Sequence, residues 1–279
     1  MGALSAAEVL VLVGLVGGQV VIGLDDPFRG RPAAEVERRL REAGERLRAR
    51  GLLSQDADDL LAIDPAVQPL VETLAHPERV FVAIVVVEGA TIAPRQTGQR
   101  HVYALRPPHA VELQAGPDGY RLSALDGEAG LAARLIETSG ISLQLPASGV
   151  PVVLPQASLH TAADVARTDP LACRAHLEAA GCAPAALDAL VDTLVQPRRN
   201  VALMVGRTDG LPGEALGLGL LDGPAGLWRL RPVEVAGQPG IELAPCAGMT
   251  LAQLVRDFVR LAEPDPAANI AVGERFSST

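Results

Sequence analysis

The chain opens with an apolar stretch, LSAAEVLVLVGLVGGQVVIGL at residues 4–24, in which Glu8 is the only charged residue. A secretory signal needs a positive charge before its apolar run, and the first arginine here is Arg29. A membrane-spanning helix needs about 20 apolar residues with few interruptions, whereas this run contains the pair Gly17–Gly18. The pattern therefore predicts elements of a soluble domain and neither a signal nor an anchor.

The same stretch carries the signals of a capped helix followed by a strand. Ser5 and Glu8 have the spacing of a capping box, in which each side chain accepts a hydrogen bond from the backbone of the other residue. Leu4 and Val9 occupy the positions of a hydrophobic staple. We expect the helix to end at the glycine pair and residues 20–24, which are short and β-branched, to form a strand.

A second helix is predicted at residues 32–53, where glutamates and arginines surround a narrow apolar stripe. The charges form i, i+4 pairs in the favourable order: Glu35–Arg39, Glu37–Arg41 and Glu42–Arg46. Because the two signs are mixed, the helix is predicted to be a solvated element docked on the core and not a nucleic-acid-binding segment.

An internal repeat follows. LVETLAHPERV at residues 70–80 and LVDTLVQPRRN at 190–200 share Leu, Val, Thr, Leu, Pro and Arg at an offset of 120, and an apolar run comes directly after each. A third collinear match links residues 111–135 with 233–255. Three matched segments in one order indicate a duplication.

The repeated unit predicts a helix that ends at a proline, a strand buried on both faces, two or three shorter strands and a closing helix. The expected shorter strands are 101–106, 110–115 and 120–125 in the first unit, and 215–221, 227–235 and 241–244 in the second. Hairpin turns are predicted at residues 117–119 and 238–240, and closing helices at 128–138 and 250–262.

These elements predict an α+β fold of two related α/β halves, with mainly antiparallel sheets about a pseudo-twofold axis. The predicted division is an N-terminal half with added leading helices at 1–137, a linker at 138–158, a C-terminal half at 159–263 and a loosely held tail at 264–279. The linker is expected to be irregular apart from a short strand at 150–154.

The composition of the chain excludes several classes of protein. The chain has 279 residues, is 48% hydrophobic and carries a net charge of −9, which indicates a globular protein without a nucleic-acid-binding surface. Its 24 basic residues are all arginine, so enzymes that depend on a Schiff-base, Walker or Ser–Lys lysine are excluded.

The sequence offers little catalytic or metal-binding chemistry. It contains no H-E-x-x-H, G-x-S-x-G or P-loop motif. Cys173, His176 and Cys182 are the best metal candidates, but a structural zinc site needs a fourth ligand and none is evident. We expect no metal, no cofactor and no catalytic residues. With Cys246 the cysteines number three, which fits a reducing cytoplasm and not a disulfide framework.

Four parts of the chain resemble the EspG family of type VII (ESX) secretion-associated proteins. They are the opening segment, the Arg/Glu helix that ends in RLRARGLL, the step LVETLAHPERV, and the late segment GLWRLRPVEVAGQPGIELAPCAGMTLAQLVRDFV. The resemblance lies in element order and apolar spacing. It implies two related α/β halves and a cytosolic chaperone, without catalytic residues, that holds helical PE–PPE pairs by the tip and keeps them soluble for export.

Three functions stay open at this point. The first is an adaptor or chaperone of a helical export substrate. It would bind through the second sheet with Leu218, Leu220, Leu227 and Trp228, although a lone tryptophan in a sheet is also typical of a core. The second is a small-molecule-binding protein or enzyme with a pocket between the halves, near His101, His109 and Arg121. The third is a structural subunit that self-associates through sheet edges.

Overall fold

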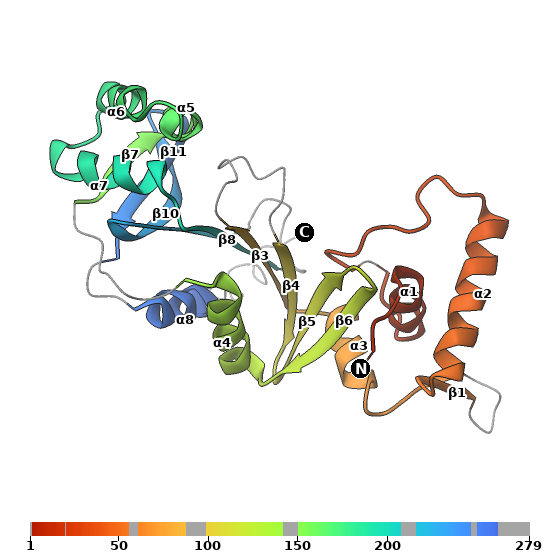
Figure 1. The fold of residues 1–279 in the computed structure, drawn as a ribbon. Coiled ribbons are helices and arrows are strands. Elements are labelled where there is room, and N and C mark those ends of the chain that lie inside the picture. The colour runs from red at the N-terminus through yellow and green to blue at the C-terminus, as the bar shows by residue number, and fades with distance from the viewer. Residues whose placement is uncertain are drawn as a thin grey trace, which may run out of the picture.

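The computed structural model describes residues 2–19, 21–55, 61–87, 99–141, 150–207, 216–246 and 250–261. Within them the chain has an α+β fold of eight helices, a nine-stranded antiparallel sheet and a two-stranded sheet (Figure 1). The helices are α1 Ala6–Leu15, α2 Ala33–Ala49, α3 Gln68–Ala75, α4 Gly127–Ser139, α5 Gln156–Ala166, α6 Pro170–Ala179, α7 Pro184–Val195 and α8 Leu251–Leu261. The strands are β1 Leu53–Gln55, β2 Leu61–Ile63, β3 Arg79–Val87, β4 Gln99–Arg106, β5 His109–Gly116, β6 Gly119–Leu125, β7 Val152–Pro155, β8 Arg199–Arg207, β9 Leu216–Gly223, β10 Gly226–Val235 and β11 Gln238–Pro245.

The large sheet has the strand order β6-β5-β4-β3-β8-β9-β10-β11-β7, so β3 and β8 form its middle. Ala83 pairs with Leu203 at the centre of their antiparallel ladder. Outward from this pair, each side takes its next three strands in chain order, as the internal repeat predicts. β7 is an addition that pairs with β11 at the edge. A superposition of the two halves about a pseudo-twofold axis stays a prediction.

The helices of the two halves also correspond. α3 ends two residues before Pro77 and α7 ends two residues before Pro197. The residues that follow these helices, His76 and Gln196, have nearly equal backbone angles, φ −131° and ψ 56° against φ −129° and ψ 61°. α4 and α8 then follow the last strand of each half, in the places predicted for the closing helices.

The two faces of the sheet are covered differently (Figure 1). On one face, α4 and α8 contact each other and enclose a single core with the middle strands. On the other face, α1, α2 and α3 form one core with the strands of the first half. The helices α5, α6 and α7 form another core with the strands of the second half. The middle of this second face lies between the two cores.

The capped helix at the start of the chain is confirmed. The backbone N–H of Ser5 donates to Oε2 of Glu8 at 2.7 Å, and the backbone N–H of Glu8 donates to Oγ of Ser5 at 3.3 Å. Leu4 and Val9 are buried together in the core of the first half. Among the described residues, no helix is long and apolar enough to cross a membrane.

The strand predicted at residues 20–24 is wrong for the part that is described, because residues 21–24 form a turn; Val20 lies outside the described residues. Gly23 has φ +89°, and a Cβ there would lie 2.4 Å from Cγ2 of Val102 on β4. The chain therefore packs tightly over β4 at this point and does not pair with it as a strand.

The second predicted hairpin turn is misplaced by two residues. Residues 238–240 belong to β11, and the turn is made by Ala236 and Gly237, both with positive φ. Gly240 is required for packing instead, because a Cβ there would lie 2.4 Å from Cγ2 of Val235. The linker proposed at 138–158 contains the end of α4, β7 and the start of α5, while residues 142–149 and the tail at 262–279 lie outside the described residues.

Candidate functional site

Among the described residues, helices cover one face of the middle of the large sheet and leave the other face open. Phe81, Leu203 and their neighbours toward α4 and α8 are buried. Side chains that point the other way are only partly buried, and Met204 is 39% exposed. β3, predicted to be buried on both faces, is thus fully buried on one. We call the uncovered region the open face and define it by six residues: Val82, Ile84, Ala202, Met204, Gly217 and Gly219.

The open face consists of two cross-strand rows on β3, β8 and β9. In the first row Val82 pairs with Met204, and Met204 with Gly217. In the second row, Ile84, Ala202 and Gly219 are paired in the same order, and Leu230 of β10 extends it. None of these side chains is polar, so the rows form an apolar floor between the two cores. Apolar surface of this kind marks interaction sites in globular proteins.

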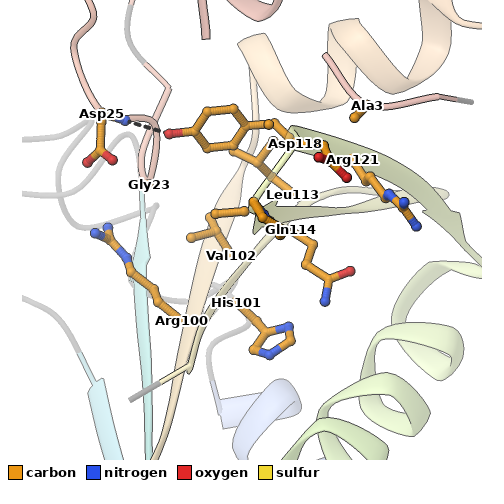
Figure 2. Close-up of a pocket in the computed structure, with 15 residues that line it drawn as sticks. Ala3, Gly23, Asp25, Arg100, His101, Val102, Leu113, Gln114, Asp118 and Arg121 are labelled. Atoms are coloured by element: carbon orange, nitrogen blue, oxygen red, sulfur yellow. Dashed lines mark hydrogen bonds between the residues drawn. The ribbon is translucent and has the colours of Figure 1, made fainter. Parts of the chain in front are cut away.

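A cavity of about 710 Å³ adjoins the open face on the side of the first half. Val102, which pairs with Val82, and Leu113 contribute buried apolar surface to it. The backbone N–H of Asp25 donates to the Tyr120 hydroxyl at 3.2 Å, which ties the loop after α1 to β6 above the cavity (Figure 2). Because Val82 and Val102 are cross-strand neighbours, the cavity lies next to the open face, although Val102 itself is buried.

The residues expected around a pocket between the halves are not brought together. His101 and Arg121 line the cavity, but His109 does not, and every lining residue comes from the first half. In Figure 2 His101 points away from Asp25, because His101 and Val102 lie on opposite faces of β4. The cavity at this position therefore lies within the first half and not between the halves.

His101 takes part in a buried ionic cluster instead. Its Nδ1 lies 3.1 Å from Oε1 of Glu112, and Nε of Arg134 on α4 donates to Oε2 of the same carboxylate at 2.8 Å. Burial by itself would raise the pKa of Glu112, but the hydrogen bonds from His101 and Arg134 lower it. All donors to this carboxylate come from β4 and α4, so the cluster fastens α4 to the sheet. The sequence showed no spacing signal for it.

All four residues predicted to contact a partner are buried in the free chain. Leu218, Leu220 and Leu227 lie in the core beneath α4 and α8, and Trp228 lies in the core with α5, α6 and α7. The burial of Trp228 supports the alternative interpretation, in which it is a core residue. On β9 the intervening glycines, not the leucines, face the open side. The leucine–glycine alternation of this strand was the available signal.

The candidate metal ligands are not arranged as a site. Cys173 and Cys182 are buried, whereas His176 is exposed. Burial raises the pKa of both thiols and so disfavours the thiolate that a metal requires. No group of three possible ligands occurs in the part of the chain that the structure describes. That the protein binds no metal stays a prediction.

Comparison with known proteins finds a matching family model and a solved structure with a similar fold. The EspG family model matches residues 5–257. A solved structure of the Mycobacterium tuberculosis type VII secretion system chaperone EspG5, in complex with the PE25–PPE41 dimer, is similar with a TM-score of 0.59 and 19% sequence identity. The match covers 92% of this chain and 93% of that one, and at this identity it shows a shared fold. No curated protein sequence gives a significant match.

Proposed function

The chain belongs to the EspG family, and from this premise we propose that it is a type VII secretion chaperone that holds a helical export substrate on its open face. The observation that carries the proposal is the apolar floor left between two cores in the middle of the sheet. Monomeric proteins seldom keep such a face uncovered unless a partner binds it.

The partner that best fits is a helical pair of the PE–PPE type. EspG5, which shares the fold, is solved with the PE25–PPE41 dimer. An apolar floor bounded on two sides by helices suits the apolar end of a helical hairpin, because helix side chains pack into such surfaces. The net charge of −9 would keep copies of the free chaperone apart while the face is empty.

The proposal includes a non-enzymatic role in the cytoplasm. Free cysteines at positions 173, 182 and 246 are in keeping with a reducing compartment. The cavity lies beside the open face, and Val102 in its lining pairs with Val82, so we assign the cavity to the same binding surface and not to a separate activity.

The test is coexpression with a helical pair of the PE–PPE type. The wild type should make the pair more soluble and copurify with it at equal amounts. Met204→Arg should weaken binding by about tenfold or more, because binding would bury an unpaired charge. Leu171→Arg is the matched control: this leucine on α6 is 78% exposed and away from the open face.

Two results would overturn the proposal. One is a wild-type chain that neither solubilises nor binds any helical pair but turns over a small metabolite. The other is a stoichiometric complex that Met204→Arg leaves intact.

A further inference from the structure

Three glycines of β8 and β9 lie in or next to the open face: Gly206, Gly217 and Gly219. A fourth on the same side, Gly223, ends β9 and packs against Thr193 of α7. A glycine inside a strand weakens it, because the residue loses more conformational freedom on folding and has no side chain to pack. Such a glycine needs a reason, which is a bulge, an unusual backbone angle, a crowded neighbour or the close approach of another molecule.

Among the three, the fold supplies that reason for Gly219 alone. A Cβ at Gly219 would lie 2.8 Å from Cβ of Leu230, so a side chain cannot be accommodated there without a shift. At Gly217 the nearest group to an added Cβ is Cγ of Pro232 at 3.9 Å, which is an ordinary contact. At Gly206 no described atom lies within 4 Å. Neither Gly206 nor Gly217 has a positive φ.

Gly206 and Gly217, for which the fold gives no reason, both lie next to the exposed side chain of Met204. Met204 pairs directly with Gly217 across the ladder, and Gly206 follows Met204 by two residues on the same face of β8. Because neither glycine carries a side chain, the surface next to Met204 is bare backbone in two directions: across the ladder at Gly217 and along β8 at Gly206. Methionine is flexible and adapts its shape to what packs against it.

We propose that Gly206 and Gly217 are two sockets next to Met204, one along β8 and one across the ladder, that receive bulky apolar side chains of the bound substrate. This inference rests on the proposed function, since it assigns a role to residues of the same open face. The chemistry of the walls selects the ligand groups: Met204, Val82 and Pro232 offer apolar contacts only, so leucine, isoleucine, methionine or phenylalanine side chains fit. The glycines would thus determine which helical partner is accepted.

The proposal predicts that filling the sockets weakens substrate binding without lowering the stability of the chain. The experiment measures both quantities for the same variants. Gly217→Val and Gly206→Val each add a side chain that favours strands at a position where the folded chain has room. Their thermal unfolding midpoints should equal or exceed that of the wild type. Binding of the coexpressed PE–PPE-type pair should weaken by about tenfold or more, because the sockets are filled.

Two control variants complete the design. Ala124→Val adds a valine at an exposed position of β6, remote from the open face, and should leave both stability and binding unchanged. Gly219→Val should lower the unfolding midpoint, because its Cβ overlaps Leu230.

The possible outcomes distinguish failure of this inference from failure of the proposed function. If the wild type binds the pair and both socket variants bind it equally well, the inference is wrong while the proposed function stands. If Gly217→Val and Gly206→Val lower the unfolding midpoint as Gly219→Val does, the fold itself requires the glycines and the inference is again wrong. If the wild type binds no pair, the proposed function fails first.

Discussion

Glu112 is a buried carboxylate that joins three elements of the first half. It lies on β5 and is 2% exposed, and it is paired with His101 on β4 and Arg134 on α4. Removing one member of such a cluster leaves the remaining polar groups buried without a partner, which costs more than the hydrogen bond itself. Its contribution to stability should therefore be measurable and should depend on pH.

Glu112→Gln should lower the free energy of unfolding by about 1–3 kcal/mol at pH 7. Because the folded-state pKa of Glu112 lies below its ordinary value of 4.5, its contribution is present above about pH 4.5 and is lost as the pH falls through the folded-state pKa. Urea unfolding from pH 7 to pH 3 should show the difference between wild type and variant shrinking on acidification. The exposed Glu37→Gln is the control, and a difference that stays constant to pH 3 would contradict the cluster's role.

The sequence predicts correctly those properties of a residue that its neighbours along the chain determine. The alternation of leucine and glycine in ALGLGLL places the two residue types on opposite faces of β9. It does not reveal which face is covered, because α4 and α8 supply the cover from distant parts of the chain. Leu218 and Leu220 were therefore assigned to a partner surface, whereas the structure buries them.

At the scale of elements, the helices and strands of the repeated unit lie within a few residues of their predicted positions. Periodicity and capping are properties of neighbouring residues, so they can be read without the fold. The two errors arose from packing contacts, one between distant segments and one within the β10–β11 hairpin. Gly23 packs over Val102 and Gly240 packs against Val235, and neither contact is visible from local composition.

Ser5→Ala tests the capping box of α1. The variant loses the hydroxyl that accepts from the backbone of Glu8, and it should lower the free energy of unfolding by about 0.5–2 kcal/mol. Ser123→Ala, at an exposed position of β6, is the matched control and should have no effect. Equal unfolding midpoints in urea for Ser5→Ala and the wild type would show that α1 does not depend on this cap.

At the scale of the whole molecule, the open face results from how the two halves join. Each half puts its leading helix on one face of the sheet and its closing helix on the other. When β3 pairs with β8, the closing helices α4 and α8 meet over the middle, while α3 and α7 stand over strands farther out. No described helix covers the middle of their face. The sequence predicted two related halves, but the pairing of β3 with β8 that creates the site is a property of the assembled sheet.

Hydroxyl-radical footprinting of Met204 tests the central claim most directly. Its thioether oxidises readily and is 39% exposed in the free chain. If the open face holds the substrate, oxidation of Met204 should fall to near background in the purified complex with the helical pair, while modification of the exposed Leu171 on α6 stays the same. A stoichiometric complex in which Met204 oxidises as fast as in the free chain would contradict the account, because the substrate would then be bound elsewhere.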